Sequence, residues 1–183
     1  MKKDVVAGLG EIGLPICKII SRNFPVYGYD TDKKLIPNNP KKFENYPVRF
    51  LHICIPYSKF FLPNVLKLNK KFLPESIIVH STIKPKTTQN LQKKLSIPII
   101  YSPTRGVHKR MTLDLKRYTK FFALENKTKN SALISKNYVN LMKKCGIKTK
   151  RLSNPITLEL SKIICDTSYY GWLINYAQMS KMI

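Results

Sequence analysis

The feature that most constrains the fold of this chain is a glycine-rich hexapeptide near the N-terminus. Gly8, Gly10 and Gly13 have the spacing G-x-G-x-x-G and make up three of the seven glycines in the chain. The apolar segment at residues 3–7 predicts a buried strand before this turn, and isoleucines at helical spacing predict a helix after it. A strand, a glycine turn and a helix in this order are what a dinucleotide-binding turn requires.

Each glycine of such a turn has its own physical role. The first permits the tight turn, the second lets a pyrophosphate approach the backbone, and the third lets the helix pack closely on the strand. The start of the helix, near Glu11 and Ile12, then faces the phosphates. Asp30 ends the next predicted strand, at the distance expected of a carboxylate that accepts ribose hydroxyls. Because that carboxylate repels a 2′-phosphate, the sequence predicts NAD as the cofactor rather than NADP.

The rest of the chain alternates predicted strands with predicted helices. Further strands are predicted at residues 25–29, 50–55, 76–80, 97–101, 121–124 and 148–152. Helices are predicted at residues 12–23, 60–72, 87–95, 131–145 and from 157 to the C-terminus, and residues 31–47 are predicted to be a loop or a degenerate helix. This alternation indicates an α/β fold, with a Rossmann-type, mostly parallel sheet, helices on both faces and a long C-terminal helix. We divide the chain into an NAD-binding Rossmann domain at 1–153 and a C-terminal helix at 154–183.

The chain is very basic, with 33 Lys and Arg against 10 Asp and Glu and a formal net charge of +23. Lysines outnumber arginines and are scattered along the chain, so codon bias explains the excess better than nucleic-acid binding, which stays an alternative. Neither a membrane-spanning apolar run nor a Cys-x-x-Cys pair is present, so we predict a cytoplasmic protein that binds no membrane and no metal.

Five motifs in order along the chain carry a resemblance to a known family. They are Gly8–Pro15, Ile53–Pro56, His80–Thr88, Ser102-Pro103 and Glu159–Lys162. With these motifs, the chain resembles the nucleotide-sugar (UDP-glucose/GDP-mannose) dehydrogenases, which are related to the 6-phosphogluconate and β-hydroxyacid dehydrogenases.

The resemblance implies roles for several residues that the glycine turn alone does not reach. It implies cofactor contacts from Cys54, Ile55, Pro56, Ser81 and Thr82. It also places Thr82 near the nicotinamide and the reacting water, which makes Thr82 a catalytic candidate.

Lys162 and Asp166 are the other catalytic candidates. They are four residues apart, so both project from one face of the C-terminal helix. The resemblance implies that Lys162 binds or protonates the reacting oxygen, and Asp166 would hold that lysine protonated as a donor. On the residues alone, an ordinary helical ion pair is the alternative interpretation.

The basic stretch after the strand at 97–101 is the candidate for substrate binding. Ligands of open α/β sheets bind at the carboxyl ends of the strands. We therefore expect Thr104, Arg105, His108 and Arg110 to contact an anionic substrate; the alternative is a solvated basic loop.

Three departures from the family weaken the inference of catalysis. Thr104 stands where the family has Glu, and Asp166 stands where it has Asn. The family's second half, with its sugar-nucleotide domain and its thioester-forming Cys, lies outside these 183 residues. Two hypotheses follow: an NAD-dependent oxidoreductase acting on a CH–OH group of an anionic, sugar-nucleotide-like substrate, or a non-catalytic NAD(H)-binding module or partner subunit.

The C-terminal helix also suggests self-association. Tyr169, Tyr170, Trp172 and Leu173 are among its many large apolar residues. If they are exposed, they form an association surface, and we expect a homodimer through this helix.

Overall fold

The computed structural model describes residues 1–38, 41–125 and 130–181. Two residues of the predicted loop, 39–40, and the last two of the predicted C-terminal helix, 182–183, lie outside this range. One seven-stranded sheet has the order β2-β1-β3-β4-β5-β6-β7. Its strands are β1 (Lys3–Ala7), β2 (Val26–Tyr29), β3 (Val48–Ile53), β4 (Ser76–Val79), β5 (Ile99–Tyr101), β6 (Lys120–Leu124) and β7 (Thr149–Arg151). Every pair of neighbours is parallel except β5 and β6, which are antiparallel.

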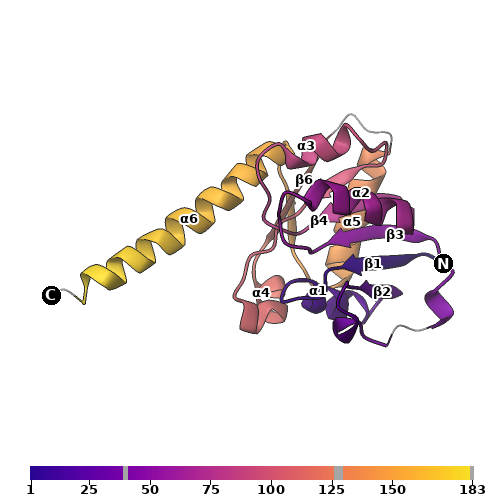
Figure 1. Cartoon of the computed structure of the whole chain (residues 1–183), viewed down its shortest axis with the longest axis horizontal. Coiled ribbons are helices and arrows are strands. Elements are labelled where there is room, and N and C mark those ends of the chain that lie inside the picture. The colour runs from indigo at the N-terminus through magenta and orange to yellow at the C-terminus, as the bar shows by residue number, and fades with distance from the viewer. Residues whose placement is uncertain (39–40, 126–129, 182–183) are drawn as a thin grey trace.

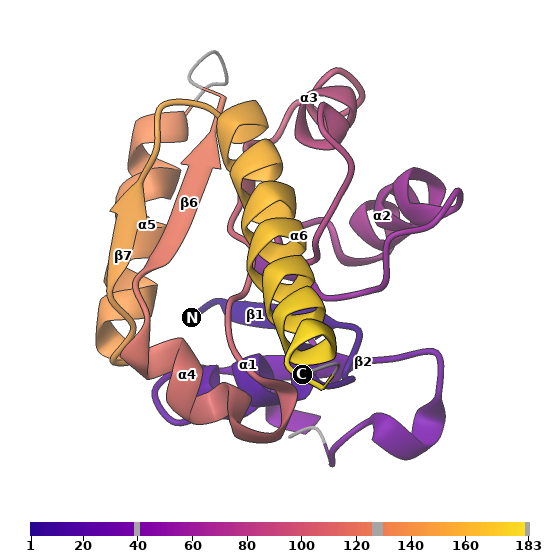
Figure 2. The ribbon, with the colours of Figure 1, turned by 90° about the vertical axis from the view of Figure 1, so that its left-hand side faces the viewer.

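Helices cover both faces of this sheet (Figures 1 and 2). One face carries α1 (Gly13–Ile20), α4 (Met111–Arg117) and α5 (Ser131–Lys144). The other carries α2 (Phe61–Phe72), α3 (Thr87–Gln92) and the first turns of α6 (Pro155–Met179). The predicted α/β architecture, with its mostly parallel sheet and long C-terminal helix, is confirmed.

Successive residues of the central strands supply the two layers of the core. Val5 and Ile77 pack under α2 and α3, whereas Val6 and Ile78 pack under α1 and α5. Side chains alternate between the faces of a strand, so a strand covered on both sides is apolar at most positions. This requirement explains why these strands appear in the sequence as continuous apolar runs.

Several bounds differ from the prediction: α1 and α3 each end three residues earlier, and β5 begins two residues later. Three further differences concern β3, α4 and residues 31–47. Strand β3 begins and ends two residues earlier than the apolar run at 50–55 indicated. Helix α4 was not predicted, because its seven residues are too few to show a periodic pattern. In the described part of 31–47, which was predicted to be a loop or a degenerate helix, the structure has two single 3₁₀ turns, η1 (Lys33–Leu35) and η2 (Lys41–Phe43).

Two histidines of the central strands are buried in the core. The rings of His52 and His80 stack with centroids 5.2 Å apart, and His52 Nδ1 lies 2.9 Å from His80 Nε2. The second ring nitrogen of His80 lies 3.1 Å from the carbonyl oxygen of Ser102. Burial, with the nearby charges of Lys120 and His52, holds the pKa of His80 well below its usual value. His80 is therefore a neutral structural residue.

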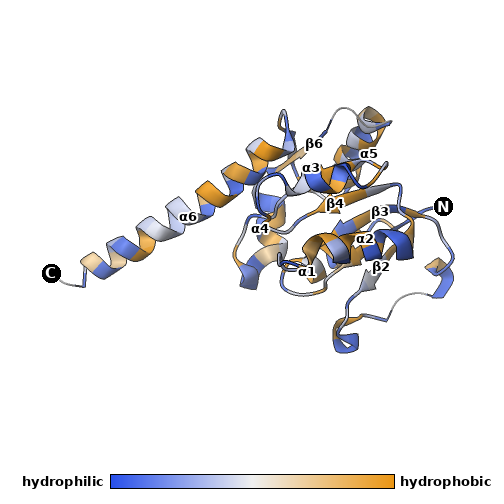
Figure 3. Ribbon diagram, turned by 45° about the horizontal axis from the view of Figure 1, so that its top comes forward, coloured by the Kyte–Doolittle hydropathy of each residue, from blue (hydrophilic) through white to orange (hydrophobic). Residues whose placement is uncertain are grey.

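Helix α6 is fixed to the body at its start only. Asn154 caps it by accepting a hydrogen bond from the backbone N–H of Thr157 at 2.9 Å, and Pro155 occupies the first turn. The fully buried carboxylate of Glu159 accepts hydrogen bonds from the backbone N–H groups of Lys86 and Thr88 and from the Thr88 hydroxyl. Beyond these turns the helix extends away from the sheet, with apolar and polar residues mixed along it (Figures 1 and 3). None of the helices in the described ranges is long and apolar enough to cross a membrane.

Candidate functional site

A large cleft of about 1000 Å³ lies at the carboxyl ends of β1, β3 and β4. Pockets that bind small molecules and cofactors have volumes of about 300–1000 Å³, so this cleft is large enough for such a ligand. All but one of the residues predicted to bind the cofactor line it: Gly8, Gly10, Glu11, Ile12, Asp30, Cys54, Ile55, Pro56, Ser81 and Thr82. The exception is Gly13, which lies behind the turn.

The three glycines of the turn meet three different environments. Gly8 has a φ of +89°, and a side chain there would lie 2.8 Å from the backbone of Cys54. A Cβ on Gly13 would lie 1.7 Å from the carbonyl oxygen of Gly8, so only glycine lets α1 start this close to β1. At Gly10, in contrast, a Cβ would meet nothing within 4 Å. The space beside Gly10 opens into the cleft and is where a ligand can approach the backbone.

The start of α1 is open toward the same cleft. Ile12 occupies the capping position, and no side chain caps the helix there. The first N–H groups of a helix have no acceptor within the helix, and together with the helix dipole they favour an anion. The turn therefore offers backbone donors to a phosphate-bearing ligand.

Asp30 fastens the glycine turn and faces the cleft. Its Oδ2 accepts a hydrogen bond from the backbone N–H of Leu9 at 2.6 Å, and its Oδ1 accepts one from the N–H of Asp32 at 2.9 Å. A carboxylate oxygen can accept more than one hydrogen bond, so both oxygens can also receive a ligand hydroxyl. The geometry suits the ribose-binding role predicted for this residue.

Two lysines of α2 that were not predicted as site residues also line the cleft. Lys67 and Lys71 both line it, and Lys71 Nζ lies 4.1 Å from the ring centroid of Tyr29. The signal was their four-residue spacing, which puts both on one face of the helix. They add positive charge to the rim of the cleft.

The structure places His108 in the cleft, away from the other residues predicted to bind substrate. Its Nδ1 forms an ion pair with the Glu11 carboxylate, and both side chains are exposed. This pair joins the glycine turn to η3 (His108–Arg110), which precedes α4.

A second, smaller cavity of about 180 Å³ lies between the end of β5, the start of β6 and the base of α6. It brings together four of the predicted site residues, Thr104, Arg105, Lys162 and Asp166. Thr82 lines the large cleft only, so the three catalytic candidates are divided between two cavities.

Lys162 and Asp166 form the predicted pair on α6. The Lys162 Nζ donates to both carboxylate oxygens of Asp166 at 2.7 Å. The lysine side chain is 15% exposed and the aspartate side chain 36%. Through this pair the Lys162 Nζ acts as a hydrogen-bond donor at the edge of the small pocket.

Arg110 does not line the small pocket. Its Nε donates to Asp114 Oδ2 at 3.1 Å, and the N–H of Val107 donates to the same oxygen at 2.9 Å. These bonds, first of all the one from Val107, lower the pKa of Asp114. The basic stretch is thus partly held by an acidic residue of α4. Arg105 of this stretch lines the pocket, with its guanidinium 5.1 Å from the Tyr118 ring centroid.

Lys120 is the ionisable residue in the small pocket that sequence reasoning missed. It begins β6, and because β6 is antiparallel to β5, its start lies beside the carboxyl end of β5. Its Nζ donates to the carbonyl oxygen of Pro103 and to the Thr104 hydroxyl, both at 3.1 Å. The residue is only 5% exposed, and burial, together with the charge of Lys162, lowers its pKa to about 7.

Cys54 lines the cleft as a buried thiol. Burial raises the pKa of the Cys54 thiol to about 12, so this residue of the cleft is a neutral thiol at physiological pH. In the described part of the chain, no three His, Cys, Asp or Glu side chains gather as a metal ion would require.

Comparison with known proteins places this architecture among solved structures. No protein-family model matches the chain, and no curated protein matches it in sequence. UDP-D-ManNAc dehydrogenase from Pyrococcus horikoshii is similar to it with a TM-score of 0.75 and 18% identity, over 91% of this chain and 50% of that one. The chain has a Rossmann-like α/β fold.

Two further structures show how widely this similarity extends. UDP-N-acetyl-mannosamine dehydrogenase from Staphylococcus aureus has a TM-score of 0.70 and 18% identity, over 92% of this chain and 51% of that one. Prephenate dehydrogenase from A. aeolicus, in complex with hydroxyphenyl propionate and NAD+, has a TM-score of 0.66 and 18% identity. The match covers 99% of this chain and 69% of that one. The chain spans about half the length of the UDP-sugar dehydrogenases that it matches. The resemblance to nucleotide-sugar dehydrogenases is supported at the level of the fold.

Proposed function

We propose that the chain binds NAD in the large cleft and is an NAD-dependent oxidoreductase that acts on a CH–OH group of an anionic, sugar-nucleotide-like substrate. The observation that carries the proposal is the glycine turn. Gly8 and Gly13 are closed by backbone contacts, whereas Gly10 is open to the cleft beside Asp30. The similar structures support it, since their names describe dehydrogenases and one of them was solved with NAD+.

In this proposal the residues of the chain have separate tasks. The N–H groups at the start of α1 bind the pyrophosphate, and Asp30 binds the ribose hydroxyls. Bound NAD supplies the acceptor for a hydride. Thr82 lines the cleft, where the resemblance implies a place beside the nicotinamide, and Lys162, paired with Asp166, would bind the reacting oxygen of the substrate.

Calorimetric titration with NAD, NADH and NADP tests the cofactor assignment. We expect micromolar binding of NAD and NADH and weaker binding of NADP. Asp30→Ala should weaken NAD binding at least about tenfold, because it removes the ribose acceptor and releases the Leu9 N–H. Asp32→Ala is the matched control, since the Asp32 side chain accepts a hydrogen bond from the Lys34 N–H and does not line the cleft. Absence of binding at millimolar NAD contradicts the proposal.

A second candidate is a non-catalytic NAD(H)-binding module or a partner subunit. It is favoured by Thr104 and Asp166, which replace the Glu and Asn of the resembling enzymes. NAD reduction with a panel of UDP- and GDP-sugars distinguishes the two. Turnover that is lost in Lys162→Ala supports the enzyme, whereas tight NAD binding without turnover supports the module.

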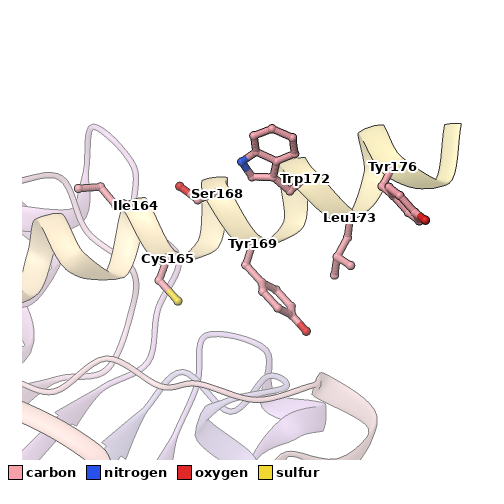
Figure 4. Close-up of a pocket in the computed structure, with 7 residues that line it drawn as sticks. All are labelled: Ile164, Cys165, Ser168, Tyr169, Trp172, Leu173 and Tyr176. Atoms are coloured by element: carbon pink, nitrogen blue, oxygen red, sulfur yellow. The ribbon is translucent and has the colours of Figure 1, made fainter. Parts of the chain in front are cut away.

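The homodimer through α6 is part of the same proposal. Beyond its first turns α6 exposes large apolar side chains, which Figure 4 shows projecting from more than one side of the helix: Ile164, Tyr169, Trp172, Leu173 and Tyr176. Residues 163–180 contain one Asp and neither Lys nor Arg, in a chain of charge +23. Two such positive bodies repel each other, so a second copy can approach most easily along this uncharged helix.

Sedimentation velocity tests the association. We expect a dimer at micromolar concentration that the double variant Trp172→Ser, Leu173→Ser converts to a monomer. Leu113→Ser is the control, because Leu113 is equally exposed but lies on α4. A monomeric wild type contradicts the dimer. The division at residue 153 and the cytoplasmic location stay predictions.

A further inference from the structure

The small pocket contains a buried cation that has no anionic partner. Lys120 Nζ is bonded to two neutral oxygens, those of Pro103 and the Thr104 hydroxyl. Among the described residues, no carboxylate lies within ion-pair distance of it. Buried charges in proteins are normally paired, because an isolated ammonium loses its hydration without compensation. This site is therefore poised to gain from a negative charge that the chain does not supply.

The carboxylates of the pocket are already engaged. Each carboxylate oxygen of Asp166 accepts a hydrogen bond from Lys162 Nζ. The carboxylate of Asp114 accepts hydrogen bonds from Arg110 Nε and from the Val107 N–H. Arg105 adds a further positive charge, and its guanidinium lies over the Tyr118 ring. The balance of charge around the cavity is positive.

We propose that this small pocket is an oxyanion site, in which Lys120 is the buried cation and the Thr104 hydroxyl a second donor to a carboxylate or phosphate group. The Thr104 oxygen accepts from Lys120, so its own proton is free to point to the ligand. A cavity of about 180 Å³ accommodates such a group with a few further atoms and is too small for a whole sugar nucleotide. The idea that this carboxylate or phosphate is part of the substrate rests on the proposed function. The binding of an anion in the pocket does not depend on that function.

The pH dependence of binding follows from the surroundings of Lys120. With a pKa of about 7, the amine is about 90% protonated at pH 6 and about 3% protonated at pH 8.5. Two neighbours at the strand ends stay neutral over this range, because the pKa of Cys54 is raised and that of His80 is lowered. The other ionisable groups that face the pocket are Arg105, Asp114, Tyr118, Lys162, Cys165 and Asp166. Anion affinity should fall about 30-fold from pH 6 to pH 8.5.

The test is a titration of the ¹⁵N-labelled full chain with sodium acetate and, separately, with sodium sulfate at constant ionic strength. Both anions keep their charge between pH 6 and pH 8.5, so a pH effect reports on the protein. We expect saturable shifts of the Thr104 and Lys120 amide signals that weaken about 30-fold at the higher pH. Stronger binding of acetate identifies a carboxylate ligand, and stronger binding of sulfate a phosphate-like one.

Two variants make the outcome specific. Lys120→Met should abolish the saturable shifts, whereas Lys116→Met, an exposed lysine of α4 outside the pocket, should leave them unchanged. Should Lys120→Met not fold, the pH dependence of the wild type and the weakening in Thr104→Val decide. Shifts that persist in Lys120→Met, or that are equal at both pH values, overturn the proposal.

The same sample separates this proposal from the cofactor assignment. NAD is added last, and the signals of Gly10 and Leu9 report on the large cleft. Anion binding without NAD binding refutes the proposed function and keeps the oxyanion site. NAD binding without anion binding refutes the oxyanion site and keeps the cofactor assignment.

Discussion

The large cleft and the small pocket are built in different ways, although they lie at the same edge of the sheet. The cleft is made mainly of backbone turns that follow parallel strands, and its shape depends on residues with little or no side chain, such as Gly8 and Gly13. The pocket is made of side chains from three distant segments, which meet at Thr104, Lys120 and Lys162. A site formed by a local turn is recorded in consecutive residues, whereas a site formed by long side chains depends on the whole fold.

The sharpest test of this contrast is inside the glycine turn. Gly13→Ala puts a methyl group 1.7 Å from the Gly8 carbonyl oxygen, so backbone must move and we expect a loss of at least about 3 kcal/mol in the free energy of unfolding. Gly10→Ala should change stability by less than about 0.5 kcal/mol, since nothing lies near it, yet weaken NAD binding. Urea denaturation and calorimetry measure the two effects. Equal destabilisation by both substitutions would contradict a turn with one open and one closed glycine.

The next effect concerns the buried lysine of the pocket. Between its folded pKa of about 7 and an unfolded value of about 10.4, the unfolded state binds more protons, so this residue makes stability rise with pH. The slope from one such group is about 1.4 kcal/mol per pH unit. The stability of wild type relative to Lys120→Met should therefore increase by about 2 kcal/mol from pH 7.5 to pH 9. Parallel pH profiles in urea denaturation would show that Lys120 keeps an ordinary pKa.

A smaller effect is expected where α6 is fixed to the body. In Glu159→Gln the side-chain amide group must face the Lys86 or the Thr88 N–H, leaving a donor unpaired at a cost of about 1–2 kcal/mol. The exposed Glu75, which pairs with Lys2 at the surface, provides the control variant Glu75→Gln. Thermal denaturation measures both, and an unchanged Glu159→Gln would mean that the carboxylate does not hold the helix.

The smallest effect on stability is expected for the pair on α6. Lys162→Met should cost no more than about 0.5 kcal/mol, as for other helical ion pairs, and should leave NAD affinity within about twofold. It should nevertheless abolish turnover. A stability loss of several kcal/mol would make Lys162 a structural residue of the pocket.

The residues of the first strand and turn show what the sequence was able to predict. Strand β1 has the predicted bounds Lys3–Ala7, and the glycines of the turn, Asp30 and Thr82 lie beside one cleft or directly behind it. Their signal was local: apolar runs, glycine spacing and the end of the next strand. Burial on both faces of the sheet left few other sequences possible for these strands.

Lys120 and Asp114 show what the sequence was not able to predict. Lys120 reaches the functional edge only because β6 runs antiparallel to β5, and nothing in the residues of β6 indicates its direction. Asp114 lies in an unpredicted seven-residue helix and takes Arg110 away from the pocket. Both depend on how the chain between β5 and β6 folds back, which is a property of tertiary packing.

Association of the protein is expected to change the local unfolding of the free end of α6. A single helix of some four turns in water is close to the balance between helix and coil, because nucleation is costly and no packing supports it. Amide hydrogens beyond Lys162 should therefore exchange with solvent within seconds in an isolated copy, while those of β1 and β4 are retained far longer. Covering this helix would slow that exchange in proportion to occupancy. Deuterium uptake by the free end of α6 should therefore measure how much of the protein is assembled at a given concentration.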